Sequence, residues 1–321
     1  MAIDPKLYEL DRIDDAFHGQ PPPHGFEWWY FDAIFDNGYS MVTSWHIGEM
    51  ETANLEYRLI VFSIYDPDGK KTDAGVEFPA SAVFASTETC DVKMGDNHLH
   101  GEFPRHEIHF RSGDMGADLI FENLTQGIRP PPDGVMHFGR EPDKYLGWAI
   151  AQPRARVTGK LILAGEEILV NGVGYHDHNW GKVSLQELLE HWYWGRLFLP
   201  NHTVIYAVGR MPESLGYEKM AMLIAIKGEK LLQWSSHINA EPSGLEVDEL
   251  TGTKYPRKLV LKMDDSRING EVILRLRKLI ESPEPPRASE GHGYFRFLSD
   301  CDVKLDVDGE KIEVEMPLVH E

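Results

Sequence analysis

One aromatic segment occurs twice in the chain, and this repeat restricts the fold more than any other feature of the sequence. Residues 27–31 read EWWYF, residues 191–194 read HWYW, and each leads through an apolar stretch to a turn that contains asparagine. The two align without gaps at a spacing of 164 residues (residue 27 to residue 191), so that Trp28 matches Trp192 and Asn37 matches Asn201. A repeat of this length suits a whole domain and is too long for a solenoid unit. Although aromatic residues are common in strands generally, the match predicts one β-domain present twice.

Apolar and polar residues alternate along most of the remaining chain, as they do in half-buried β-strands. Turn sequences such as residues 66–69 (DPDG) and 164–166 (AGE) join neighbouring segments into hairpins. Only residues 184–190 have a helical pattern, with Ser184 as the N-cap and Glu187 as its capping-box partner. Because helical crossovers are missing, a parallel α/β sheet is disfavoured. We predict an all-β fold of two consecutive antiparallel barrels joined by a short helical linker.

The domain boundaries follow from the repeat, the linker and a run of prolines. Residues 20–24 (QPPPH) separate a polar N-terminal arm from the first strand, because consecutive prolines hold the backbone extended. We therefore expect an arm over residues 1–25, a first domain over residues 26–182 and a second domain over residues 183–321.

Composition excludes several classes of partner. The chain has 321 residues with 52 acidic and 32 basic side chains and a net charge of −20, which disfavours nucleic acid and anionic membranes as partners. The N-terminus lacks an apolar signal segment, and no apolar run reaches membrane-spanning length. With only Cys90 and Cys301 present, the sequence favours a reducing, cytoplasmic location, while a disulfide between the two cysteines stays open.

The densest group of chemically active side chains lies at residues 172–181, which read GVGYHDHNWG. In an extended strand, successive side chains point to opposite faces. One face then carries the odd-numbered residues Tyr175, Asp177 and Asn179. The other face carries the even-numbered residues His176, His178 and Trp180. The segment thus offers two different candidate sites.

The histidine face is compatible with a metal ion, because two histidines two residues apart on a strand can reach one Zn or Fe ion. No second clear ligand pair is visible, since the histidines at positions 98, 100, 106 and 109 form unspecific patterns. We therefore interpret His176 and His178 as hydrogen-bonded structural residues and predict no metal. A metal site is the alternative.

The Asp177 face is compatible with acid catalysis. Burial among aromatic rings disfavours an ionised carboxyl group and so raises its pKa, which allows proton delivery near neutral pH. Protonation of an alkene produces a carbocation, which the faces of Trp and Tyr rings stabilise. In the alternative interpretation, Asp177 accepts hydrogen bonds from backbone N–H groups in a glycine-rich turn and the aromatic residues are core.

Three segments together resemble the carotenoid 1,2-hydratases (hydroxyneurosporene synthases) and their AttH-like relatives: residues 27–30, 172–181 and 192–195. The resemblance covers most of the chain. It implies two lipocalin-like β-barrel domains, acid-catalysed addition of water to a terminal isoprenoid double bond, and no organic cofactor. The Tyr-x-Asp pair implicated in the hydratases matches Tyr175 and Asp177. Their upstream His-x-Trp pair is matched at residues 146–148 (LGW) by Trp148 alone, so a hydrophobic substrate in general is favoured over a carotenoid.

We therefore predict an enzyme without organic cofactor that hydrates, isomerises or cyclises a small hydrophobic isoprenoid or polyene. Asp177 would be the general acid, and Tyr175 would orient it or hold the water. The residues predicted to bind substrate are Trp148, Trp28, Trp29, Trp180, Trp192, Trp194, His176 and His178.

The alternative is a lipid carrier, because a barrel of about eight strands can hold one small ligand without changing it. The sequence leaves open the oligomeric state and whether the cavity lies inside the first barrel or between the domains.

Overall fold

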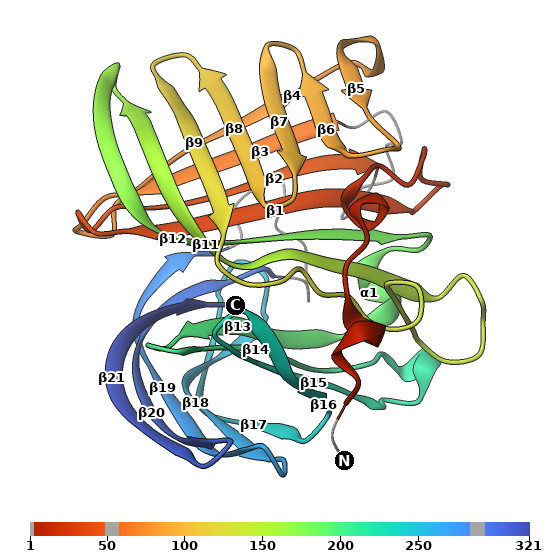
Figure 1. Ribbon diagram of the computed structural model, residues 1–321, viewed down its shortest axis with the longest axis vertical. Helices are drawn as coiled ribbons and strands as arrows, with labels where there is room; N and C mark the ends of the chain where they lie inside the picture. Colours follow the sequence, from red (N-terminus) through yellow and green to blue (C-terminus); the bar gives the residue numbers. More distant parts are fainter. Residues whose placement is uncertain (1–2, 49–57, 283–292) are drawn as a thin grey trace. The chain divides into compact units, whose positions relative to one another are not determined.

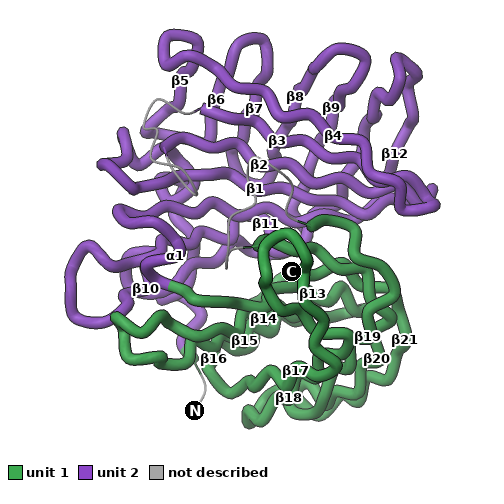
Figure 2. Tube along the Cα trace, turned by 180° about the vertical axis from the view of Figure 1, so that it is seen from behind, with its two compact units in different colours: residues 1–3, 189–321 green, residues 4–188 purple. Residues whose placement is uncertain are grey.

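The structure is a computed structural model that describes residues 3–48, 58–282 and 293–321. It divides into two compact units, which we call the first unit (residues 4–188) and the second unit (residues 1–3 and 189–321) (Figure 2). Each unit contains one sheet of antiparallel strands, so the predicted all-β fold is confirmed. The predicted linker helix is present as α1 (Leu185–Leu188). The division between the units falls a few residues after the boundary expected from the sequence. The expected domain bounds stay a prediction.

The first unit is a curved sheet of 12 strands (Figure 1). Its order is β4-β3-β2-β1-β12-β11-β9-β8-β7-β6-β5, and β10 pairs with β11. The strands are β1 (Phe26–Phe35), β2 (Ser40–Gly48), β3 (Arg58–Tyr65), β4 (Lys71–Glu77), β5 (Val83–Ala85), β6 (Cys90–Met94), β7 (Asn97–Glu102), β8 (Arg105–Ser112), β9 (Met115–Asn123), β10 (Val135–His137), β11 (Tyr145–Leu163) and β12 (Glu166–Gly181). Three short 3₁₀ helices accompany them: η1 (Pro5–Tyr8), η2 (Arg12–Asp15) and η3 (Ala80–Ala82).

The second unit is a sheet of 9 strands in the order β16-β15-β14-β13-β21-β20-β19-β18-β17. Its elements are β13 (His191–Phe198), β14 (His202–Arg210), the 3₁₀ helix η4 (Glu213–Leu215), β15 (Lys219–Lys227), β16 (Lys230–Ser235), β17 (Ile238–Val247), β18 (Lys254–Asp264), β19 (Ile268–Glu281), β20 (Arg296–Val307) and β21 (Glu310–His320). In both sheets a meander of four strands begins with the repeated aromatic strand, and the last strand of the unit pairs with that strand. The internal repeat seen in the sequence therefore corresponds to a repeated strand order.

The interior of the first unit is filled by aromatic and aliphatic side chains that alternate with polar ones along each strand. Its largest fully buried members are Trp29, Phe31, Trp45, Phe62, Phe110 and Phe121. The long β11–β12 hairpin turns at Ala164 (φ 53°) and Gly165 (φ 80°), the left-handed conformation that a tight two-residue hairpin turn requires. This hairpin carries the motif of residues 172–181 along the sheet.

The N-terminal arm packs on the first unit and does not stand apart from it. Asp11 begins η2 with a capping box that it shares with Asp14. Asp14, Asp15 and Ala16 are buried, and the Trp29 indole donates a hydrogen bond of 3.0 Å to the backbone carbonyl of Asp15. The arm thus brings two aspartates into contact with the strands that carry the histidines.

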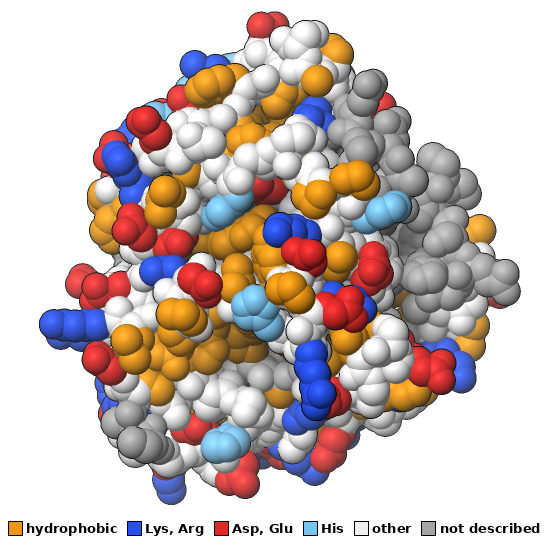
Figure 3. Space-filling view, turned by 90° about the vertical axis from the view of Figure 1, so that its right-hand side faces the viewer, with side chains coloured by type: hydrophobic (Ala, Val, Ile, Leu, Met, Phe, Trp, Pro, Cys, Tyr) orange, Lys and Arg blue, Asp and Glu red, His pale blue; other side chains and the backbone are white. Residues whose placement is uncertain are grey.

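Cys90 and Cys301 are both buried and free, and they belong to different sheets, so the disulfide left open by the sequence is not formed. On the face drawn in Figure 3, basic and acidic side chains are intermingled and no large basic patch gathers. None of the helices within the described ranges is long and apolar enough to cross a membrane.

Candidate active site and the buried histidines

Asp177 lies on β12 and is buried, with 5% of its surface exposed. Three side chains donate hydrogen bonds to its carboxyl group. The Trp148 indole N–H and the Tyr175 hydroxyl both reach Oδ2 at 2.7 Å, and the Asn179 amide reaches Oδ1 at 2.9 Å. All three donors are neutral groups, and all three residues are buried or nearly so. Asp177 is therefore the acceptor at the centre of a small buried network.

The strand pairing explains why these side chains meet. Tyr175, Asp177 and Asn179 alternate with their neighbours and so share one face of β12, as the sequence predicts. Trp148 on β11 pairs with Asn179, and the register of β11 shifts between Ala149 and Gln152, next to the position of Asp177. Such irregularities in a ladder redirect side chains. Here the irregularity adjoins the point where Trp148 reaches across to the carboxyl group.

The position of Asp177 does not fit the alternative interpretation, in which it supports a glycine-rich turn. It lies inside β12, and the donors described above are side chains and not backbone N–H groups. The surroundings also differ from the apolar cavity expected from the sequence, because the rings of Trp148 and Tyr175 each present a polar atom to the carboxyl group. Donors of this kind stabilise a carboxylate, so the site can receive the charge that remains after Asp177 gives up a proton.

On β1, Tyr30 pairs with Asp177 and Trp28 pairs with Asn179. The Tyr30 ring meets the edge of the Tyr175 ring with centroids 6.3 Å apart, and its hydroxyl donates to Asp32 at 2.8 Å. Trp28 stacks on Phe26 at 4.6 Å. Aromatic rings thus continue from the Asp177 network onto the neighbouring strand.

The opposite face of β12 carries His176 and His178, which are fully buried. Each uses Nδ1 to contact a backbone carbonyl: His176 contacts Tyr30 at 2.9 Å and His178 contacts Asp14 at 3.2 Å. Each presents Nε2 to a carboxylate. His176 Nε2 lies 3.2 Å from both oxygens of Asp15, and His178 Nε2 lies 2.9 Å from Oε1 of Glu27, although that pair is not aligned as a hydrogen bond.

Asp15 and Glu27 are the acidic partners of these histidines. Burial by itself raises the pKa of Asp15, but the charge of His176 and the hydrogen bonds from His106 and His176 outweigh burial and hold this pKa well below its usual range. The pKa of Glu27 is likewise lowered against burial by the nearby His178 and by the hydrogen-bonded contact with His18. The same burial lowers the pKa of His106 and of His178. These two carboxylates are therefore ionised in the folded protein at neutral pH.

The structure separates the predicted site residues into groups. Trp148, Tyr175 and Asp177 come together, whereas Trp29 and Trp180 lie with the histidines on the other face. Trp29 stacks on His178 at 4.4 Å, and Trp180 stacks on His18 at 3.8 Å. Trp28 and Trp29 therefore do not line one cavity, because neighbours on a strand point to opposite sides.

The other two predicted tryptophans, Trp192 and Trp194, lie on β13 of the second unit. There the guanidinium of Arg196 lies 5.4 Å from the centre of the Trp194 ring.

Sequence reasoning missed Asp15, Glu27 and Cys90 as members of the buried network, and also the exposed His18 that contacts Glu27. It named His106 only as one of several unspecific histidines. The aspartates at positions 11 and 14 spell a capping box, which signals a helical turn in the arm but not its contact with the strands. Glu27 had a signal, since a charged residue at the start of an apolar strand requires a partner. Cys90 had no signal and His106 only the unspecific pattern with His109, because strand order alone brings both residues to Asp15.

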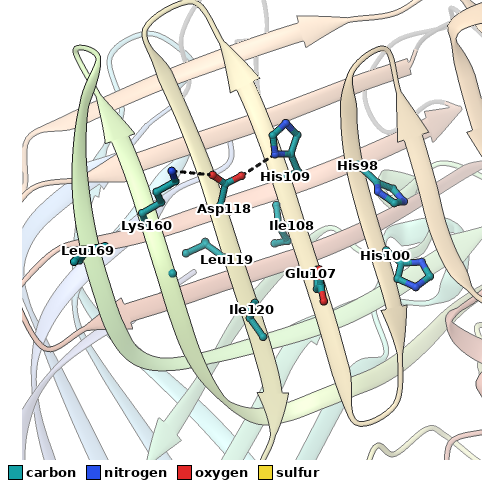
Figure 4. A pocket seen from close by; sticks show the side chains of 11 residues that line it. His98, His100, Glu107, Ile108, His109, Asp118, Leu119, Ile120, Lys160 and Leu169 are labelled. Carbon is teal, nitrogen blue, oxygen red and sulfur yellow. Dashed lines mark hydrogen bonds and ion pairs between the residues drawn. The ribbon is translucent and has the colours of Figure 1, made fainter.

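A separate hollow of about 550 Å³ lies over β7, β8, β9, β11 and β12 (Figure 4). Asp118 lies in its wall, where it is hydrogen-bonded to His109 and forms an ion pair with Lys160. Ile120 and Leu169 supply apolar surface. Leu169 is eight residues from Asp177 on β12, which corresponds to about 25 Å along a strand. The hollow is therefore distinct from the Asp177 network.

Comparison with known proteins assigns the chain to a family. The model of the AttH-like family matches residues 61–279. Hydroxyneurosporene dehydrogenase of Chlorobaculum tepidum is 27% identical over 237 residues, which cover 62% of this chain and 60% of the relative, so the match spans less than two thirds of that protein. The quinolone epoxide rearrangement protein penF of Penicillium thymicola is 26% identical over 263 residues, covering 74% and 69%.

Among solved structures, a putative AttH protein of Nitrosomonas europaea superposes with a TM-score of 0.72 at 14% identity, covering 100% of this chain and 98% of the other. That likeness agrees with the fold described above. More than half of the sequence lies within the matched family model. The chain is a member of the AttH-like family.

Proposed function

We propose that the chain is an enzyme of the hydratase or isomerase type that acts on a small hydrophobic molecule, with Asp177 as the group that exchanges a proton with the substrate. The observation that carries this proposal is the buried carboxyl group of Asp177 with Trp148 Nε1 and Tyr175 Oη both 2.7 Å from one oxygen. The proposed chemistry needs only side chains.

The donors explain how a proton would be transferred. When protonated Asp177 gives its proton to a substrate alkene, the new C–H bond leaves a carbocation on the substrate and a carboxylate on Asp177. Trp148 and Tyr175 already point at that carboxylate, so they stabilise the charge as it develops without any rearrangement. In a hydration, water then adds to the carbocation and loses a proton, which restores the acid. In an isomerisation or cyclisation, the carbocation loses a different proton or closes a ring first.

The rings of Trp148, Tyr175, Tyr30 and Trp28 support the same proposal. A positive charge over the face of an aromatic ring is stabilised electrostatically, and the effect increases when water is excluded. Strand pairing places these four residues on the face of the sheet that carries Asp177. A hydrophobic substrate against this face would have aromatic rings beside the carbon atoms that become positive.

The family relatives support the substrate class and the type of reaction. One is named for hydroxyneurosporene and another for the rearrangement of a quinolone epoxide. A rearrangement leaves the atomic composition unchanged, and protonation of an epoxide oxygen promotes ring opening. An acid held among aromatic rings can serve either an alkene or an epoxide.

A lipid carrier is less well supported by the structure. The interior of the first unit is filled by the fully buried side chains of its core, and a carrier of neutral lipid would gain nothing from the desolvation of a carboxyl group such as Asp177.

A product screen tests the proposal. The full chain is incubated with a panel of a terminal isoprenoid alkene, a conjugated polyene and an alkenyl epoxide, and products are analysed by mass spectrometry. We expect a product that has gained one water or that has the mass of the substrate and a new retention time. Asp177→Asn should slow its formation about 10²- to 10⁴-fold, whereas Asp265→Asn, which changes a buried carboxyl group bonded to Gln233 in the second unit, should not. Substrates bound but recovered unchanged would contradict the enzyme proposal and favour a carrier.

A further inference from the structure

Four potential metal ligands from four separate segments meet inside the first unit: Asp15 of η2, Cys90 of β6, His106 of β8 and His176 of β12. All four are buried, and their ligand atoms lie within 4.8 Å of one another. We propose that these residues form a binding site for a zinc-like divalent cation, which would fasten the N-terminal arm to the strands.

The orientation of His176 is the first argument. Its Nδ1 lies 2.9 Å from the carbonyl oxygen of Tyr30. A carbonyl oxygen only accepts hydrogen bonds, so Nδ1 carries the hydrogen, and Nε2 of the neutral ring is left with a lone pair. That lone pair faces the two oxygens of Asp15 at 3.2 Å. A proton or a metal ion must lie between these groups, because lone pairs at this distance repel each other.

The carbonyl contact matches the usual environment of a metal ligand. Histidines that bind metals generally donate their other N–H to a carboxylate or a backbone carbonyl, which fixes the tautomer and the ring orientation. Phe31 also holds the His176 ring, since the two are stacked at 3.7 Å with an interplanar angle of 5°. His176 is therefore fixed with Nε2 directed toward Asp15.

The surroundings of His106 supply the second argument. Its Nε2 lies 2.8 Å from Asp15 Oδ2, and its ring lies directly against β7 at Gly101. A Cβ at position 101 would lie only 1.9 Å from the His106 ring, so glycine is needed there to let the ring reach the carboxylate. The sequence thus leaves space for this histidine at a close approach between strands.

A small cavity lies beside the same side chains. It measures about 20 Å³, and its lining includes Asp15, Cys90 and His106. A space of this size is sufficient for a single water molecule or a small ion. Three of the four proposed ligands therefore border a space that one ion would fill.

The donor set identifies the class of metal. Two imidazoles, one thiolate and one carboxylate suit Zn²⁺, which prefers four ligands in a tetrahedron, and exclude Ca²⁺ and Mg²⁺, which prefer oxygen. Ligand atoms in such a tetrahedron are about 3.3–3.8 Å apart, and the four ligand atoms here lie within 4.8 Å of one another. Burial and the nearby Asp15 carboxylate raise the pKa of the Cys90 thiol. Metal binding would replace the thiol proton and release it.

Cobalt binding to the full chain tests the proposal, because a Co²⁺ ion bound to a thiolate has a charge-transfer absorption that a nitrogen or oxygen site lacks. The protein is treated with a chelator, dialysed and titrated with Co²⁺ and then with Zn²⁺. The chain has only two cysteines, so Cys301→Ser leaves Cys90 as the one possible source of the band. His98→Gln is a matched control, because His98 belongs to a separate, partly exposed cluster with Asp91 and His100. His18→Gln tests the neighbouring cluster, in which His18 is exposed and Glu27 and His178 are buried.

We expect one Co²⁺ per chain, with the thiolate band present in the unchanged protein, in Cys301→Ser, in His98→Gln and in His18→Gln, and displaced by Zn²⁺. Cys90→Ser should lose the band, and His106→Gln should weaken binding at least about tenfold. If Cys90→Ser fails to fold, the band in Cys301→Ser and a rise in melting temperature with Zn²⁺ still decide the question. Three outcomes would overturn the proposal: no Co²⁺ binding, a bound ion without the thiolate band, or loss of binding in His98→Gln or His18→Gln. A protonated His176 paired with Asp15 would then explain the geometry.

Discussion

The two units begin with the same aromatic strand but place different partners beside it. In the first unit β1 pairs with β12 at ten positions, and Tyr30 lies opposite Asp177. The repeat aligns Tyr30 with Trp194, which exchanges two backbone hydrogen bonds with Glu321. Asp177 and Glu321 therefore occupy corresponding places. The three donors to Asp177 described above are neutral groups, whereas the guanidinium of Arg296 lies 2.9 Å from the Glu321 carboxylate.

In the function proposed above, Asp177 is a reactive carboxylate and Glu321 a structural one. A guanidinium neutralises its partner and keeps it ionised, so Glu321 serves to join β20 to the end of the chain. Neutral O–H and N–H donors stabilise a carboxylate without pairing it with a fixed positive charge. We infer that one copy of the repeat carries chemistry and the other carries structure.

The largest expected effect is on turnover. Asp177→Asn should reduce the rate about 10²- to 10⁴-fold, the range for loss of a positioned acid. Glu321→Gln changes the corresponding carboxylate of the second unit and should leave turnover unchanged. Rates are compared on the product identified in the screen, and an equal loss in the two variants would show that the units do not differ in this way.

The free energy of unfolding should fall more for a variant at the Glu321 carboxylate than for a variant at the Asp177 carboxylate. Arg296→Met leaves the carboxylates of Glu281 and Glu321 without the guanidinium that bonds to both, and should lower the free energy of unfolding by about 3–5 kcal/mol. Asn179→Ala removes one hydrogen bond to Asp177 and should lower it by about 1–3 kcal/mol. Urea unfolding measures both, with Arg277→Met as control. Arg277 pairs with Asp300 on the exposed surface, where loss of a pair changes stability by at most about 1 kcal/mol.

The second unit should also lose stability in acid through His320. Burial lowers the pKa of this side chain to about 4 from 6.5. The unfolded chain therefore takes up a proton as the pH falls below 6.5, while the folded protein does not until about pH 4. Stability should fall by about 3 kcal/mol over this interval. His320→Gln should reduce the slope of unfolding free energy against pH between 6.5 and 4. An unchanged slope in this variant would contradict the assignment to His320.

The last prediction concerns the loss of a single hydrogen-bond donor to Asp177. Tyr175→Phe removes one hydrogen bond to the charged form of Asp177 and should slow turnover about 10- to 150-fold, since such bonds contribute about 1.5–3 kcal/mol. Tyr206 is a buried tyrosine of the second unit whose hydroxyl has no partner among the described residues, so Tyr206→Phe is the matched control and should leave turnover unchanged. Unaltered turnover in Tyr175→Phe would remove this residue from the mechanism.

Local patterns in the sequence were sufficient to predict the strands and the two faces of residues 172–181. Alternation at period two depends only on neighbours along the chain, so the grouping of Tyr175 with Asp177 and of His176 with His178 followed directly. The matching aromatic strands likewise predicted a repeated strand order. These features need no knowledge of distant contacts.

The partners of those side chains could not be predicted in the same way. Asp15 is 161 residues from His176 in the sequence, and the prolines at positions 21–23 suggested that the arm stood apart. Trp148 reaches Asp177 next to a register shift that alternation does not reveal. Strand order across the sheet, and not local sequence, decides which residues meet at each site.

Turnover of an alkene substrate in heavy water tests the central claim most directly. If Asp177 delivers a solvent-exchanged proton to carbon, the product should contain one deuterium in a carbon-bound position, and Asp177→Asn should form this product about 10²- to 10⁴-fold more slowly. A product that contains no carbon-bound deuterium, or an Asp177→Asn variant that makes the labelled product at the unchanged rate, would contradict proton transfer by this carboxyl group.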